Sequence, residues 1–216
     1  MQIGRKRNVS EASYLGNIFK LFSVAFTPAT QQIVKVIVEG TLADDMATTW
    51  RALSLPDDAI DSFLTTMQEY RGRDAEEVLH ELRIDWAHMY MGDKPRVTNT
   101  EGLWRFRAEG RDTVRMINRY TNEVADFMRE CGVKRQQQYN DCIDYIENEC
   151  DFAAFLANGP EYLAEMGKDN IELLGDFMDD HMLKWAPGFC EDVQREAQTP
   201  YYRALAALMG VFLNEF

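Results

Sequence analysis

Apolar residues recur at alternating steps of three and four along most of the chain, and this period constrains its fold more than any other feature. One series runs Val114, Ile117, Thr121, Val124, Met128 and Cys131, and Gly132 follows where a helix C-terminus favours a left-handed residue. This spacing predicts a helix with one buried face. The strongly β-branched run at residues 33–38 lies inside a window that also has helical spacing. The sequence therefore predicts an all-α fold.

Proline, glycine and capping residues mark the expected helix boundaries. Pro56-Asp57 predicts the start of one helix, Pro187 the end of another, and Thr199-Pro200 the cap and first turn of the last. The last helix is expected to bury a face with Leu205, Leu208, Met209 and Phe212. These marks indicate about nine or ten helices. Because no linker or internal repeat divides residues 1–216, we expect a single globular domain.

The N-terminus combines the basic residues 5–7 with an apolar stretch at residues 18–26, which together could suggest a secretory signal. Polar residues 8–13 and Lys20 interrupt that pattern. The stretch instead fits an amphipathic first helix, with the positions Tyr14, Ile18, Leu21, Phe22 and Ala25 on one face. No run of 18 apolar residues occurs, so we expect no stable membrane insertion.

The charge balance is acidic, since 23 Lys and Arg stand against 36 Asp and Glu, a formal net charge of −13. Such a chain repels a phosphate backbone, which argues against nucleic acid and favours a basic peptide as partner. Its cysteines lack the Cys-x-x-Cys spacing of zinc or dithiol sites. Cys142 and Cys150 are expected on one helix about 12 Å apart, too far for a disulfide. Reduced thiols indicate the cytoplasm.

Catalytic patterns are weak in this sequence. The three histidines do not stand beside a serine or cysteine in a known nucleophile motif, and no Gly-rich phosphate loop is present. His181 shares helical spacing with Phe177 and Trp185, which favours the edge of a core face over a metal ligand. We therefore expect no enzyme activity, metal or other cofactor.

Two acidic segments, residues 57–61 and 176–180, support an alternative reading. Paired Asp-rich helices can hold Mg²⁺ against a diphosphate, as in an all-α enzyme of isoprenoid metabolism. The chain is short for that class, and acidic residues after Pro56 also suit a helix N-terminus. A purely structural protein that binds a folded helix is a further alternative.

A helix is predicted to begin near Tyr139, with four carboxylates on or near one face. These are Asp141, Asp144, Glu147 and Asp151. Like charges at this spacing are mutually unfavourable by a few tenths of a kcal/mol per pair. The face is either simply solvated or held ready for a cationic partner such as arginine, which pairs bidentately with a carboxylate.

Several segments resemble one known family along the whole length of the chain. Residues 177–189 have a Phe, His, Trp and Phe pattern, and Pro200-Tyr201-Tyr202 matches an aromatic pair at the start of a final helix. Upstream, residues 85–92 and 101–104 match an aromatic segment ending in glycine and a following Glu-x-x-aromatic pattern. On these residues the chain resembles the TorD/DmsD/NarJ-type redox-enzyme maturation chaperones.

The resemblance implies a TorD-like helical bundle and a cytoplasmic, system-specific chaperone. Such a protein binds the twin-arginine signal peptide and the catalytic subunit of a molybdenum oxidoreductase precursor of the DMSO-reductase type. It aids cofactor insertion and proofreading before export by the twin-arginine pathway. The resemblance is compatible with a monomer or a homodimer.

The resemblance also implies where the peptide binds. Trp86, Met89 and Tyr90 share one helical face and are predicted to form a groove wall, because methionine and aromatic side chains suit an apolar run. Glu101 and Trp104 are expected to form a second side of the groove, and Asp141 with Cys142 its end. Many family members have Asp-His at the start of a central helix, where residues 140–143 of this chain read Asn-Asp-Cys-Ile. Asp141 is thus expected to meet an arginine, while a thiol cannot replace the imidazole.

Overall fold

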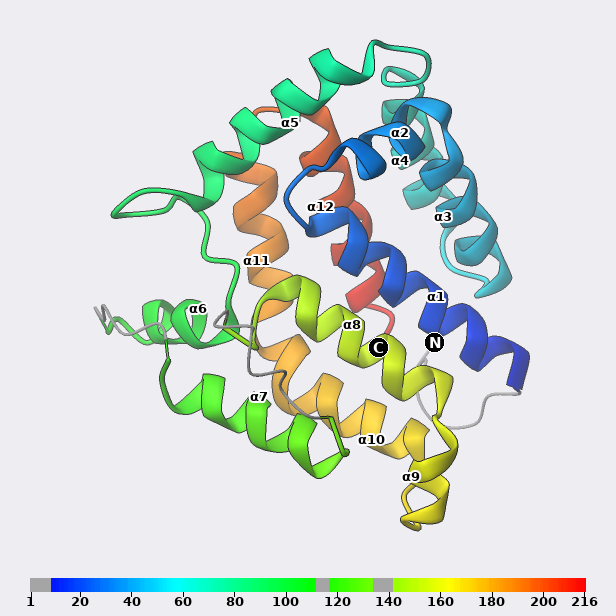
Figure 1. Cartoon of the computed structure of the whole chain (residues 1–216), viewed down its shortest axis with the longest axis vertical. Helices are drawn as coiled ribbons and strands as arrows, with labels where there is room; N and C mark the ends of the chain where they lie inside the picture. Colours follow the sequence, from blue (N-terminus) through cyan, green and yellow to red (C-terminus); the bar gives the residue numbers. More distant parts are fainter. Residues whose placement is uncertain (1–8, 112–116, 134–141) are drawn as a thin grey trace.

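The computed structural model describes residues 9–111, 117–133 and 142–216, which form a bundle of helices (Figure 1). The helices are α1 (Val9–Phe26), α2 (Gln31–Glu39), α3 (Thr41–Ala52), α4 (Asp57–Gln68), α5 (Ala75–Tyr90), α6 (Glu101–Ala108), α7 (Arg119–Glu130), α8 (Ile146–Asn158), α9 (Glu161–Glu165), α10 (Asn170–Phe177), the π-helical turn η1 (Met178–Met182), α11 (Leu183–Glu196) and α12 (Pro200–Leu213). Within these ranges the β-structure is limited to an isolated bridge between Thr100 and Tyr145. The predicted all-α, TorD-like fold class is confirmed.

The number of helices slightly exceeds the prediction. Since α10, η1 and α11 continue without a break, the described residues form eleven separate helical rods instead of nine or ten. The short helix α9 has only five residues, which is too few for an apolar period to be recognised in the sequence.

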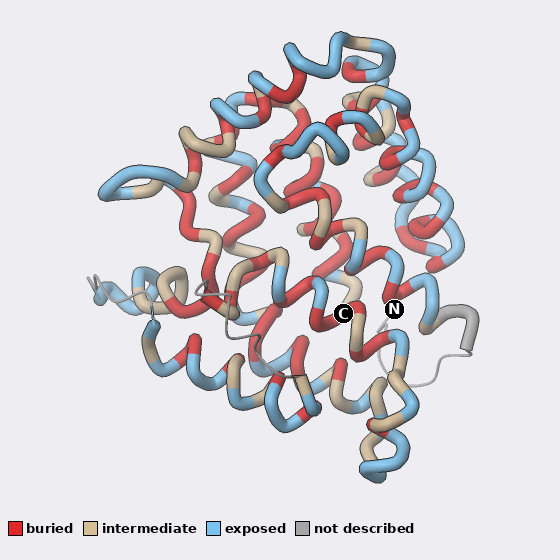
Figure 2. The backbone as a smooth tube through the Cα atoms, viewed as in Figure 1, coloured by how far each residue is buried: buried red, intermediate tan, exposed pale blue. Residues whose placement is uncertain are grey.

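The core lies between α1, α8, α11 and α12. α1 packs along α8, and α12 packs along α11 and also contacts α1. Phe19 and Phe22 of α1 contact Phe212 of α12, with ring centroids 5.1 and 5.6 Å apart. Figure 2 shows buried backbone where these helices meet and exposed residues along the outer helices. The buried face of the last helix is therefore confirmed. On the first helix Ile18, Phe22 and Ala25 are buried as expected, whereas Leu21 is only partly buried and Tyr14 is exposed.

Two of the predicted boundaries are found where the sequence places them. α4 begins at Asp57 directly after Pro56, and α12 has Pro200 in its first turn. Thr199 precedes α12, but its hydroxyl donates to buried Asp85 of α5 at 2.6 Å and makes no cap bond. Asp85 also accepts from the Thr199 backbone N–H at 2.7 Å. These bonds hold α5 against the junction of α11 and α12.

The helix predicted from Val114 begins later. α7 starts at Arg119 with Asn118 as its cap, and Ile117 lies before it with an exposed side chain. Val114 lies outside the described residues. The rest of the predicted stripe is buried, and Gly132 has a φ of +83°, the expected left-handed conformation.

Pro187 was expected to end a helix, and this prediction is wrong. It lies inside α11, in a rod that runs from α10 through η1. A proline within a helix removes one backbone hydrogen bond and crowds the carbonyl four residues before it. Here Trp185, Phe189 and Val193 of the same helix are fully buried. The burial of this face outweighs the loss of one hydrogen bond, so the helix continues.

The helix predicted from Tyr139 is also placed differently. α8 begins at Ile146, so Cys142 precedes the helix that contains Cys150, and Asp144 precedes it too. Asp144 is fully buried and Asp151 is exposed, so the predicted carboxylate face does not exist. Tyr139 and Asp141 lie outside the described residues. All four cysteines are buried thiols without a disulfide.

Membrane-spanning capacity is limited in the described part of the chain. No helix there is long and apolar enough to cross a membrane alone, and residues 12–26 with α2 meet the length and composition criteria only as a pair bent by 118°.

Candidate functional site

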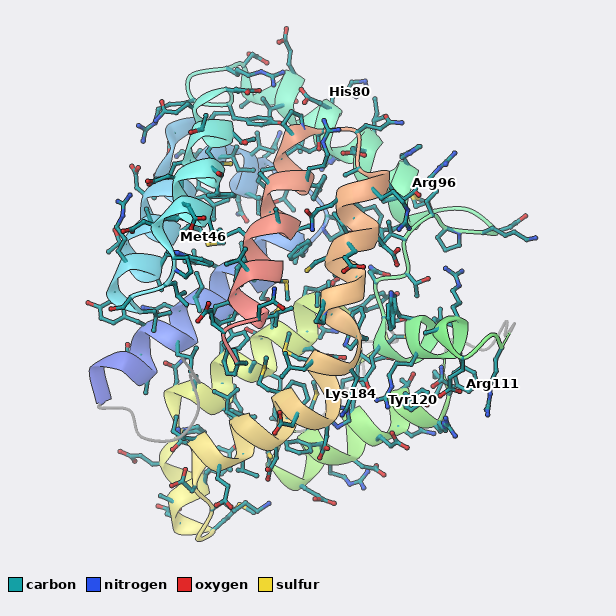
Figure 3. The ribbon with its side chains drawn as sticks, turned by 180° about the vertical axis from the view of Figure 1, so that it is seen from behind. Met46, His80, Arg96, Arg111, Tyr120 and Lys184 are labelled. Carbon is teal, nitrogen blue, oxygen red and sulfur yellow. The ribbon has the colours of Figure 1, made fainter. Side chains whose placement is uncertain are left out.

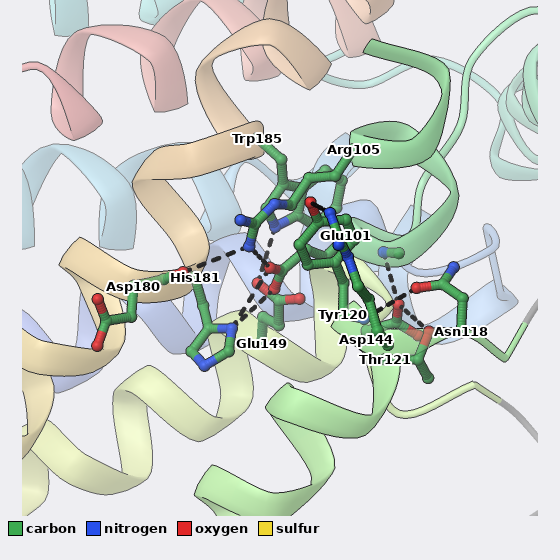
Figure 4. A network of polar contacts seen from close by, with 12 residues as sticks. Glu101, Arg105, Asn118, Tyr120, Thr121, Asp144, Glu149, Asp180, His181 and Trp185 are labelled. Atoms are coloured by element: carbon green, nitrogen blue, oxygen red, sulfur yellow. Dashed lines mark hydrogen bonds and ion pairs between the residues drawn. The ribbon is translucent and has the colours of Figure 1, made fainter. Parts of the chain in front are cut away.

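Glu101 begins α6 with its side chain completely buried, and two basic groups surround it (Figure 4). Its carboxylate accepts from Arg105 one turn later at 2.5 Å. The His181 Nδ1 atom lies 3.1 Å from the same carboxylate. The Arg105 guanidinium also reaches the backbone carbonyl of Asp180 at 3.4 Å. Glu101 therefore fastens α6 to the π-helical turn η1.

Asp144, just before α8, is the second buried carboxyl of this region. It accepts from the Gly102 backbone N–H at 2.8 Å and from the Thr121 hydroxyl at 2.9 Å. The Glu101 backbone N–H donates to the Asp144 carbonyl at 3.0 Å. Burial raises the pKa of Asp144 above its ordinary value, while the bonds from Gly102 and Thr121 oppose the rise. Asp144 thus joins α6, α7 and α8.

Glu149 of α8 is the third buried carboxyl, and it accepts from the Trp185 indole N–H of α11 at 2.9 Å. Burial raises the pKa of Glu149 well above its ordinary value, and the neighbouring negative charge of Glu101 raises it further. Burial therefore favours the protonated form of Glu149. Glu101, Asp144 and Glu149 are hereafter called the carboxyl cluster.

His181 and Trp185 lie four residues apart in the continuous rod of η1 and α11, so they share one face and both reach the carboxyl cluster. His181 is buried and packs against Phe177 and Phe127, with ring centroids 5.2 and 5.6 Å apart. The expectation that His181 borders the core is confirmed.

The carboxyl cluster is enclosed, which limits what it can do. Its three carboxyls are at most 1% exposed and join elements from α6 to α11. Within residues 9–111, 117–133 and 142–216, no group of three or more His, Cys, Asp or Glu side chains is arranged to hold a metal ion. The two acidic segments proposed for Mg²⁺ lie in separate parts of the fold, in α4 and at the α10–η1 junction (Figure 1). The cluster therefore holds helices together.

Trp86 and Tyr90 of α5 form one side of a different region. Their rings are 5.3 Å apart, and the Tyr90 ring stacks on Phe189 of α11 with centroids 6.5 Å apart. Both side chains are partly exposed, whereas Met89 between them is completely buried. Met89 thus supports the helix from inside and is not available to a ligand in this conformation.

Trp86 and Tyr90 each have a buried polar atom without a hydrogen-bond partner. These atoms are the indole Nε1 of Trp86 and the hydroxyl oxygen of Tyr90. Burial raises the pKa of Tyr90 well above its ordinary value, so the hydroxyl keeps its proton and can donate. An unsatisfied buried donor costs about 1–3 kcal/mol. Both donors are buried in this conformation, and they lie one helical turn apart in side chains that are otherwise partly exposed.

Trp104 of α6 packs against the same stretch of α11. Its indole N–H donates to Asp192 at 3.1 Å, and its ring covers Gly188. A side chain at Gly188 would begin 2.2 Å from the Trp104 ring, so only glycine permits this contact. Trp104 and Tyr90 therefore contact the adjacent residues 188 and 189 of α11, and Trp86 packs on Tyr90. These three aromatic residues are called the aromatic surface below.

The remaining predicted site residues do not join the aromatic surface. Glu101 belongs to the carboxyl cluster, and Cys142 is buried before α8, where its carbonyl accepts from Asn148 at 3.1 Å. Asp141 lies outside the described residues. Because α8 starts at Ile146, the acidic residue at the start of this helix is Asp144, followed by Tyr145.

Other residues of these two regions were not singled out in the sequence. Gly188 and Asp192 contact Trp104 across 84 and 88 residues, and no local pattern signals such contacts. Glu149 stands within an acidic helix and resembles a solvated residue. For Asp144 a signal existed, since it belongs to the carboxylate series, but the series was assigned to a helix face.

Residues 54–191 match the family described as nitrate reductase delta subunit. Chaperone protein TorD of Vibrio cholerae serotype O1, strain El Tor Inaba N16961, is 28% identical over 96 residues, which cover 43% of this chain and 43% of that protein. TorD of the Classical Ogawa 395 strain matches with the same identity and coverage. The match thus spans less than half the length of these relatives.

Proposed function

Since the chain belongs to the nitrate reductase delta subunit family, we propose that it is a cytoplasmic maturation chaperone for a redox enzyme. Its partner is the precursor of a molybdenum oxidoreductase, which it recognises by the twin-arginine signal peptide. It acts by binding, without catalysis and without a cofactor of its own. Its net charge of −13 supports a basic peptide as ligand.

One observation carries the choice of site. Trp86 Nε1 and the Tyr90 hydroxyl are donors without a partner, and they lie in a partly exposed aromatic surface. A peptide backbone offers carbonyl acceptors, and aromatic rings supply rigid contact area at low entropic cost. Trp86, Tyr90 and Trp104 all fall within the family match, which supports this surface as the shared binding region.

The proposal is tested by calorimetric titration with a synthetic peptide that has paired arginines followed by an apolar run. We expect binding, and we expect the variant with paired lysines to bind at least fivefold more weakly, since a guanidinium makes bidentate bonds that an ammonium cannot. Equal affinities, or no binding, would contradict specific recognition.

A second measurement locates the site. Trp86→Phe removes the indole N–H but keeps an aromatic ring, so it should weaken the peptide about fivefold to tenfold if this donor bonds a peptide carbonyl, worth about 1–1.5 kcal/mol. The control is Tyr162→Phe, since the Tyr162 hydroxyl already donates to the Cys131 carbonyl at 2.9 Å in another part of the fold. Its loss should lower stability without lowering affinity. Equal affinity in Trp86→Phe and the wild type would remove the aromatic surface from the proposal.

A further inference from the structure

A cleft of about 720 Å³ lies between α4 and α12, away from the aromatic surface. Its floor is apolar, with Ala59 and Phe63 from α4 and Ala204, Leu208 and Val211 from α12. Seen from behind (Figure 3), α12 and α11 lie side by side, with α4 beyond α12 and α6 beyond α11. The small alanine side chains leave space for a third segment to approach both helices.

The two ends of the cleft differ because α4 and α12 are antiparallel. At one end the start of α4 is close to the end of α12, since Trp50 bonds the Pro56 carbonyl and its ring lies 6.4 Å from that of Phe212. At the other end Tyr70, which follows α4, contacts Tyr201 at the start of α12, with ring centroids 6.2 Å apart. The cleft therefore runs from the first turn of α4 to the first turn of α12.

The charges at these ends are opposite. At the start of α4, Asp57 and Asp61 both interact with Arg51, whereas Asp58 lines the cleft and has no ion pair among the described residues. At the far end Arg203 lines the cleft, donates to the Gln198 carbonyl at 3.2 Å, and has no carboxylate partner in the described part of the chain. The cleft thus has an acidic end, an apolar floor and a basic end.

We propose that this cleft binds the apolar run of the signal peptide as a helix, with the paired arginines at Asp58. This inference rests on the proposed function. An apolar helix fits a groove between two helices, and the negative C-terminal end of its dipole would face Arg203. From there the peptide passes Gln194, a cleft residue of α11, towards the aromatic surface, which then binds the C-terminal end of the same peptide. α4 lies within the family match and α12 outside it.

The test fills the cleft without touching the core. Ala207 lines the cleft and is exposed, so Ala207→Trp places a large ring in the space that the peptide needs. We expect at least a tenfold loss of affinity for the synthetic peptide with paired arginines and an apolar run. Ala164→Trp, at an exposed alanine of α9, is the matched control and should bind normally.

Two further measurements separate the possible outcomes. A peptide that keeps the paired arginines but has serines in place of the apolar run should bind the wild type weakly. It should bind Ala207→Trp with the same weak affinity, because it has no apolar run for the new ring to displace. Asp58→Asn, an exposed change that keeps the side-chain shape, should weaken the complete peptide about threefold to tenfold and flatten its salt dependence. Normal binding by both Ala207→Trp and Asp58→Asn overturns the cleft proposal and leaves the proposed function intact. A wild-type protein that does not bind the peptide overturns both.

Discussion

The carboxyl cluster and the aromatic surface both include the first turn of α6, but they differ in the kind of polar group they leave unsatisfied. In the cluster, one oxygen each of Asp144 and Glu149 lacks a partner. In the aromatic surface the unpaired groups are the donors of Trp86 and Tyr90. A buried carboxylate can take up a proton and lose its charge, whereas an indole N–H cannot lose its proton at accessible pH. The carboxyl cluster can therefore lower the cost of burying its charges by binding protons. The unpaired donors of the aromatic surface have no such way to lower their cost of burial.

The largest effect is expected where the cluster loses a carboxyl altogether. Asp144→Ala leaves the Gly102 N–H and the Thr121 hydroxyl without their acceptor in a buried site, so we expect the free energy of unfolding to fall by about 3 kcal/mol. Urea denaturation measures this loss. Asp151→Ala, which removes an exposed ion pair with Lys20, should cost under about 1 kcal/mol. Similar losses in both variants would show that the cluster does not hold the helices together.

The next effect is a pH dependence that the cluster should have and the surface should lack. The folded pKa of Glu149 is raised, so its contribution to stability is complete below the ordinary pKa of about 4.3 and is lost as pH rises through the folded value. Between those two pKa values, one such group lowers the free energy of unfolding by up to about 1.4 kcal/mol for each unit that the pH rises. Asp144 has a raised pKa too and acts in the same direction.

Glu149→Gln tests this dependence, because the amide has the same shape and still accepts from Trp185. Urea denaturation between pH 5 and pH 8 should show a smaller decline in stability for Glu149→Gln than for the wild type. Glu172→Gln, an exposed change on α10, should leave the wild-type decline unchanged. If Glu149→Gln and the wild type decline equally, the buried carboxyl does not hold its proton.

The smallest effect compares two tyrosine hydroxyls. Tyr90→Phe removes an unpaired buried hydroxyl, so thermal unfolding should show equal or slightly higher stability, by up to about 1 kcal/mol. Tyr70→Phe removes an acceptor of the Tyr201 backbone N–H, with a bond of 3.2 Å, and should lower stability by about 1 kcal/mol. Equal destabilisation by both changes would mean that the Tyr90 hydroxyl already has a partner in the free protein.

Local interactions explain which features the sequence could predict. The apolar period, Pro56 before α4, Pro200 in the first turn of α12 and Gly132 after α7 all act within one or two helical turns. The all-α fold follows from them. His181 at the border of the core was also predictable, because its neighbours Phe177 and Trp185 belong to the same rod.

Other features were decided only when distant segments packed together. Pro187 remains inside α11 because the buried face of that helix outweighs one lost hydrogen bond. Asp144 is buried because Gly102 and Thr121, 42 and 23 residues away, supply its hydrogen bonds. The Trp104 ring packs directly on Gly188, which has no side chain to block it. No spacing along the chain indicates this contact. The sequence by itself determined the helices and their buried faces, since these depend on near neighbours. Which carboxyls are buried and which aromatic donors lack partners depends on solvent exclusion by remote helices, and only the tertiary structure decided it.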